Sequence, residues 1–274
     1  MLGATVFFLE CRKGGYMNKS FISAVGVVLL LACPSSVIYG QSDIEARAAE
    51  NAQALMKGHV AWRTKLSNPG ASIKVKEVGR QGSVVQYHLY VSGMPSNNFN
   101  KVYSVVSWPV TQAKPSSSME GVSLGKDGIL MCAGRMPEQC GDPSKKDDPI
   151  EFTFNPAKGE PYRLALVAGD DKVAVVIVPD PITADDKGCE LSVERLLPHF
   201  EVTYVAGSGF PPNNDVSFDT ESYGEKHPVS TKADSEGNLQ FALMPFVSGH
   251  HQGTTTITGI GTSCSPQIKF EWGS

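Results

Sequence analysis

Apolar positions along the chain change their period near residue 70. Before that point they recur at helical spacing, and after it they alternate. Ser42 followed by Glu45 has the form of a capping box, and Asn68-Pro69-Gly70 stops the helical pattern. The pattern predicts a helix within residues 41–70 whose apolar face packs on the sheet that follows. The positions that repeat at helical spacing are Ile44, Ala48, Ala52, Leu55, Met56 and Val60.

Alternation begins at Ile73 and predicts a hairpin that extends to Val91, with its turn between Gly79 and Gly82. Further strand-like runs continue as far as Val178 and are separated by polar, glycine-containing turns. Residues 71–178 are therefore predicted to form an antiparallel sandwich or a small barrel.

The best linker in the chain is residues 179–188, a polar segment that contains two prolines and ends in glycine. After it come seven short strand-like runs within residues 189–274. Seven short strands in under 100 residues is typical of an immunoglobulin-like sandwich. The predicted fold class is all-β: two antiparallel β-sandwich domains, the first with an N-terminal amphipathic helix and the second Ig-like.

Two segments of this last region carry a family resemblance. Residues 207–216, Gly-Ser-Gly-Phe-Pro-Pro-Asn-Asn-Asp-Val, resemble the G-x-G-F-x-P-x-x-x-V stretch of bacterial Ig-like repeats of the IPT/TIG or Big type. Residues 234–237, Asp-Ser-Glu-Gly, are similar to the D-x-x-G turn that follows in those modules. The resemblance covers about the last 85 residues and implies an Ig-like module there. The sequence before residue 189 resembles no family.

Composition agrees with many short strands, since charged residues make up only 19% of the chain and 27 glycines and 18 prolines interrupt it. The formal net charge is −4. It becomes more negative without residues 1–40, which hold three basic side chains and one acidic one. An acidic protein does not attract a phosphate backbone, so nucleic acid is excluded as an expected partner.

Residues 1–40 contain an export signal. Lys19 precedes an apolar run from Phe21 to Ala32, and small residues follow, in the order of a secretory signal peptide whose true start is Met17. The run is shorter than the roughly 20 residues of a spanning helix. The expected location is the periplasm, the cell surface or the extracellular space.

Two cleavage sites fit this signal. Cleavage after Gly40 releases a soluble protein. Leu30-Leu31-Ala32-Cys33 resembles a bacterial lipobox, which implies lipidation of Cys33 and membrane attachment only through that anchor.

Without residues 1–40 the chain keeps four cysteines, an even number that favours disulfides in an oxidising compartment. Three pairings are possible, and the preferred one joins Cys132 to Cys140 and Cys189 to Cys264. The spacing of the cysteines is not that of a zinc site, and no cofactor is expected.

Two loops contain weak candidates for metal ligands. The first holds Asp142, Asp147 and Asp148, whose spacing is not that of an EF-hand, and the second holds His250 and His251. Solvated loops are the expected structure for both.

No nucleophile elbow, metalloprotease spacing or phosphate-binding glycine loop is present in the sequence. The leading hypothesis is an exported, non-catalytic binding or structural protein of the envelope or extracellular space, with an envelope protein or a glycan as its partner. The alternative is an exported hydrolase with a site in the N-terminal domain, where Glu151, Asp142 and His88 are the first residues to test.

Overall fold

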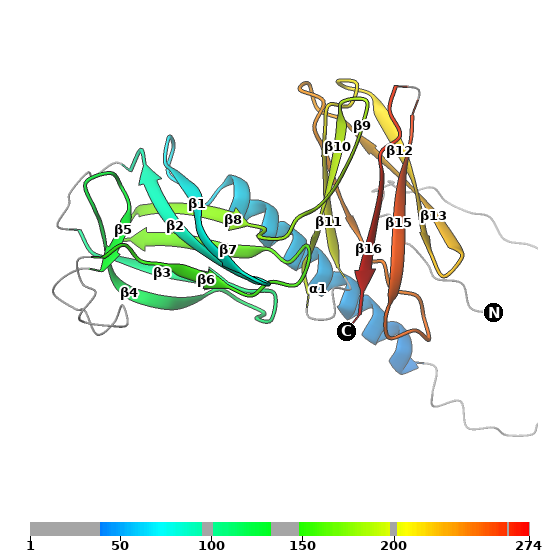
Figure 1. Ribbon diagram of the computed structural model, residues 1–274. Coiled ribbons are helices and arrows are strands. Elements are labelled where there is room, and N and C mark those ends of the chain that lie inside the picture. The colour runs from blue at the N-terminus through cyan, green and yellow to red at the C-terminus, as the bar shows by residue number, and fades with distance from the viewer. Residues whose placement is uncertain (1–38, 95–100, 133–147, 198–201, 262, 274) are drawn as a thin grey trace, which may run out of the picture. The chain divides into compact units, whose positions relative to one another are not determined.

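The computed structural model describes residues 39–94, 101–132, 148–197, 202–261 and 263–273, with side chains from residue 50 onward (Figure 1). The chain divides into two compact units, residues 1–52 and 53–274, and all contacts described below lie within the second. The one helix among the described residues of the chain, α1, covers Tyr39–Thr64. Because the helix begins at Tyr39, Ser42 lies inside it and not at its N-terminus, so the predicted capping position is wrong.

Residues 72–177 form two antiparallel sheets, one of strand order β1-β2-β6 and one of order β5-β4-β3-β7-β8. Val85 and Leu89 from the first sheet and Val105 and Leu164 from the second share one apolar core. The strands are β1 (Ser72–Gln81), β2 (Val84–Ser92), β3 (Tyr103–Trp108), β4 (Ser116–Leu124), β5 (Leu130–Cys132), β6 (Phe152–Phe154), β7 (Tyr162–Ala168) and β8 (Asp171–Ile177).

The β1–β2 hairpin was predicted with its turn between Gly79 and Gly82. Strand β1 instead continues to Gln81, and the register shifts at a bulge between Glu77 and Gly79. Arg80 donates two hydrogen bonds of 2.9 Å to the Glu77 carboxylate across this bulge. A bulge accommodates one extra residue without ending the pairing, so a glycine inside a strand does not have to mark the turn.

Residues 182–272 form a second pair of antiparallel sheets, of strand order β14-β11-β10-β9 and β13-β12-β15-β16 (Figure 1). One core joins them, with Leu191 and Val205 from the first sheet and Phe218 and Ile257 from the second. The strands are β9 (Ile182–Asp186), β10 (Cys189–Arg195), β11 (Thr203–Ser208), β12 (Asp215–Ser222), β13 (Glu225–Lys232), β14 (Leu239–Leu243), β15 (Gly253–Ile260) and β16 (Gln267–Trp272).

The arrangement confirms the predicted all-β, Ig-like fold class. Strands β9, β10, β11 and β14 make one sheet of the second sandwich, while β12, β13, β15 and β16 make the other, so the chain crosses between sheets as in an Ig-like Greek key. The two segments singled out in the sequence meet there. Phe210 donates its backbone N–H to the Gly237 carbonyl at 3.1 Å, and Gly237 has a φ of 81°, where glycine is favoured.

The predicted linker at 179–188 contains a strand. Ile182–Asp186 is β9, which pairs with β10 from Val193↔Ile182 to Cys189↔Asp186 and adds an edge to the second sandwich. The reversal uses Lys187 and Gly188, both with positive φ, 49° and 89°. Only Ile182 is buried along β9, while exposed polar side chains alternate with half-buried ones after it, and an edge strand with this composition resembles a linker in the sequence.

A disulfide joins Cys189 to Cys264, with 6.1 Å between their Cα atoms. Cys189 begins β10 in one sheet, and Cys264 lies just before β16 in the other, so the bond links the two sheets of the second sandwich. This is the pairing predicted from the sequence. Cys132 is also disulfide-bonded, but Cys140 lies outside the described residues, so the Cys132–Cys140 pairing stays a prediction.

Candidate functional site

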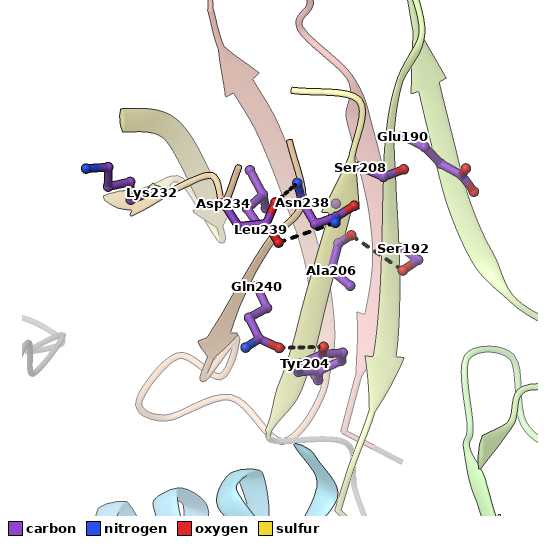
Figure 2. A pocket seen from close by; sticks show the side chains of 11 residues that line it. Glu190, Ser192, Tyr204, Ala206, Ser208, Lys232, Asp234, Asn238, Leu239 and Gln240 are labelled. Carbon is purple, nitrogen blue, oxygen red and sulfur yellow. Dashed lines mark hydrogen bonds between the residues drawn. The ribbon is translucent and has the colours of Figure 1, made fainter. Parts of the chain in front are cut away.

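An open groove of about 540 Å³ lies on the outer face of the β14-β11-β10-β9 sheet (Figure 2). The pairing register places Ser192 and Gln240 on either side of Ala206, while Glu190 lies opposite Ser208. The floor of the groove is therefore formed by small side chains, and its sides by groups that can form hydrogen bonds.

Some of the polar groups that line the groove form hydrogen bonds with one another. Figure 2 shows the Tyr204 hydroxyl donating to Gln240 Oε1 at 2.9 Å, which leaves the Gln240 amide nitrogen to donate elsewhere. Ser192 donates to the Ala206 carbonyl at 3.4 Å. At one end, Asp234 accepts the backbone N–H groups of Glu236 and Asn238, both at 2.8 Å. These bonds hold the pKa of Asp234 below its usual value, so this carboxylate is a fixed part of the turn.

The next cross-strand row of the same sheet face contacts α1. Glu194 on β10 lies directly opposite Tyr204 on β11. The His59 ring meets the Tyr204 ring edge-on, with 5.1 Å between centroids, and His59 Nε2 lies 3.1 Å from Glu194 Oε2. Arg63 donates to the other carboxylate oxygen, Oε1, at 2.7 Å. His59 and Arg63 are four residues apart, so one face of the helix places both on a single carboxylate.

This polar cluster is buried. His59 is 0% exposed and Glu194 is 4% exposed, whereas the Arg63 side chain keeps 36% of its surface in solvent. His59 Nε2 is near enough to Glu194 for an ion pair when the ring is protonated, whereas His59 Nδ1 has no hydrogen-bond partner among the described residues. Buried polar atoms without partners are rare in folded proteins, which marks this cluster as a specialised place in the structure.

The same turn of α1 makes a contact of a different kind with β3 and β7. Trp62 donates its indole N–H to the Leu164 carbonyl at 3.2 Å and packs on Trp108, with 5.8 Å between ring centroids. A Cβ at Gly58 would lie 2.7 Å from the Trp108 ring, so only glycine allows the helix to approach this closely. Arg163, fully buried, stacks on Trp108 at 4.1 Å.

Charge and burial act together on the titrating groups. Burial lowers the pKa of His59 below 6.5, Glu194 opposes this shift, and the Arg163 and Arg63 charges add to it. Burial also lowers the pKa of Arg163 to about 10, with Glu194 opposing. The pKa of Tyr204 is raised by burial. Neutral imidazole is therefore the form of His59 that this environment favours.

A second groove, of about 590 Å³, runs beside the helix and is lined largely by apolar groups. Met56 and Val60 line it from α1, and Phe241 and Ala242 from β14. These helix residues were predicted to belong to the buried stripe. Among the helix residues whose side chains are described, the predicted Ala52 and Leu55 are buried, but the stripe continues through His59 and Trp62 at a 3-4-3 spacing.

The predicted metal ligands are spread along the chain. Asp148 and His251 are exposed, and His250 stacks on Tyr223 with 3.7 Å between ring centroids. Asp142 and Asp147 lie outside the described residues, as does Cys33. Within the part of the chain that the structure describes, no three His, Cys, Asp or Glu side chains are grouped as a metal site, and no helix has the length and apolar character to cross a membrane.

Two residues proposed for a hydrolase do lie together. His88 Nε2 on β2 is 4.0 Å from Glu151 Oε1, and Gln86 donates to the other oxygen of Glu151 at 3.4 Å. Glu151 is 54% exposed, so the pair lies at the surface. The sequence analysis missed His59, Arg63, Arg163 and Glu194. The available signal was the i,i+4 spacing of His59 and Arg63 beside Trp62 on a predicted helix, but their carboxylate partner is far away in the sequence.

Comparison with known proteins adds little. No family model matches the chain, and no curated protein matches it. The resemblance to bacterial Ig-like repeats therefore stays a prediction.

Two solved structures show limited similarity. One is a two-domain fibronectin type III segment of chicken tenascin, with 14% identity and a TM-score of 0.22, covering 73% of this chain and 98% of that one. The other contains the FN1-FN3 domains of chicken CNTN1, with 7% identity and a TM-score of 0.22, covering 73% of this chain and 64% of that one. These scores are too low to indicate a shared arrangement of the whole chain.

Proposed function

We propose that this chain is an exported, non-catalytic binding or structural protein of the bacterial envelope or extracellular space. The observation that carries the proposal is the Cys189–Cys264 disulfide between the two sheets of an Ig-like sandwich. Disulfides of this kind persist in oxidising compartments, which agrees with the export signal in residues 17–40. The IPT/TIG or Big-type resemblance supports the same function.

The groove on the β14-β11-β10-β9 sheet is the proposed binding surface, and an envelope glycan is the proposed ligand. Ser208 and the Gln240 amide supply neutral hydrogen-bonding groups, and the small side chain of Ala206 lets a flat polar ligand approach the strands closely. Lys232 is outnumbered by two carboxylates, Glu190 and Asp234, and this balance disfavours a polyanion.

A matched pair of substitutions tests this surface. Ser208→Trp fills the groove, whereas Ser230→Trp places the same side chain on β13, in the other sheet of the sandwich. We expect residues 41–274 to co-sediment with purified cell-wall glycan, Ser208→Trp to reduce binding at least tenfold, and Ser230→Trp to leave it unchanged. Equal binding by both variants would remove the groove from the proposal. Turnover of peptide, ester or glycan substrates that is lost in His88→Ala would favour the hydrolase instead.

A further inference from the structure

One turn of α1, from Gly58 to Arg63, contacts two different surfaces of the protein. On β3 and β7 it uses Gly58 and Trp62 against Trp108, a contact between groups that do not titrate. On β10 and β11 it uses His59 and Arg63 against Glu194 and Tyr204, a contact in which His59 can gain a proton as the pH falls. The two contacts can therefore respond differently to acid.

We infer that this turn is an acid-sensitive latch, in which protonation of His59 loosens the helix from β10 and β11 while the tryptophan contact with β3 and β7 is kept. The groups that face the imidazole from each packed element are Glu194 on β10, Tyr204 on β11, Arg163 on β7 and Arg63 on the helix itself. With His59 neutral, one carboxylate faces two guanidinium groups. A third cation in this buried space is opposed by both arginines, and the single carboxylate is already bonded to Arg63.

The direction of the pH response follows from burial and charge. Because the pKa of His59 is lowered in the folded contact and returns to its ordinary value of 6.5 when the helix is released, the contact favours the neutral ring. The latch is at full strength above pH 6.5 and is lost as the pH falls through the lower, folded-state value. An exported protein exposed to acid would loosen the helix from the sheet next to the polar groove.

Hydrogen–deuterium exchange of the full chain tests the latch. Peptides covering residues 53–66 and 190–206 are followed between pH 7.5 and 5.5, with labelling times scaled to the intrinsic exchange rate at each pH. Uptake of one proton raises the opening constant by up to about tenfold for each pH unit below 6.5. We expect faster exchange at low pH in both peptides, with no matching change across β3 and β7.

His59→Gln keeps a polar side chain that does not titrate, and it should make the exchange of both peptides independent of pH. The matched control is His227→Gln on β13, where the imidazole is 29% exposed and lies 3.7 Å from Glu225. This variant should keep the wild-type response. Identical pH dependence in the wild type and in His59→Gln would overturn the latch.

A measurement on the unmodified protein keeps the inference testable if His59→Gln does not fold. The ring Cε1–H signal of His59 in an NMR titration should have its midpoint below 6.5. A midpoint at or above 6.5 would mean that the folded contact prefers the imidazolium, and the latch as described would be wrong.

Discussion

The two sandwiches contact the same turn of α1 through side chains of different chemistry. In the first sandwich, Trp108, with Arg163 stacked on it, packs against Gly58 and Trp62 of the helix. In the second sandwich, a buried carboxylate and a tyrosine ring, Glu194 and Tyr204, contact the helix. Their partners on the helix are His59 and Arg63. Apolar burial is insensitive to pH, whereas a buried ion cluster depends on every charge near it. One short helical segment can thus make one permanent contact and one conditional contact.

The sandwiches also differ in how they are closed. The Cys189–Cys264 bond spans a sequence separation of 75 residues and ties both sheets of the second sandwich. Among the described residues the first sandwich contains one disulfide-bonded cysteine, Cys132 at the end of the short strand β5. A long closed loop restricts the unfolded chain more than a short one.

Removing the Cys189–Cys264 disulfide should have the largest effect of the changes proposed. Replacing both Cys189 and Cys264 by serine should lower the free energy of unfolding of the second sandwich by about 4.5 kcal/mol from loop closure. Regional hydrogen exchange should show this loss in β12 and β15, with little change in β3 and β7. Serine variants are preferable to a reductant, which also reaches the Cys132 disulfide. An equal loss of protection in both sandwiches would show that they unfold as one unit.

Trp108→Ala should break the contact on the other side of the helix. It removes a buried side chain from beneath Gly58, Trp62 and Arg163, and such truncations cost about 3–5 kcal/mol. Chemical denaturation and exchange of β3 and β7 measure the loss. The acid response of the peptide 190–206 should keep its direction, because burial is the largest cause of the lowered His59 pKa and Glu194 is unchanged, although Arg163 loses the ring on which it stacks. Loss of that response would mean that the two contacts are not independent.

Gly58→Ala has the smallest expected effect, but its sign is informative. Alanine in a helix interior is ordinarily favoured over glycine by about 1 kcal/mol. Here the new Cβ would lie 2.7 Å from the buried Trp108 ring, and overpacking costs about 1–3 kcal/mol. We expect a net destabilisation of about 1 kcal/mol in thermal unfolding, with Lys57→Ala, at an exposed position, nearly neutral. Stabilisation by Gly58→Ala would show that the helix does not approach Trp108 this closely.

Local pattern determined much of this protein from the sequence alone. The change from helical to alternating spacing near residue 70 located the helix and the first hairpin, since side-chain direction follows backbone period. Short strands with frequent turns gave the Ig-like second sandwich, and the cysteine spacing favoured the bond that joins its sheets.

Only the tertiary structure decided which groups meet. The sequence pattern assigned Met56 and Val60 to the buried stripe and did not include His59, because hydropathy cannot show that a distant carboxylate will pack against it. Arg63 and Glu194 are separated by 131 residues, and no local period relates them. Strand β9 is a strand only because β10 offers it an edge. Periodicity is a property of neighbours in the chain, whereas charge pairing and edge pairing depend on neighbours in space.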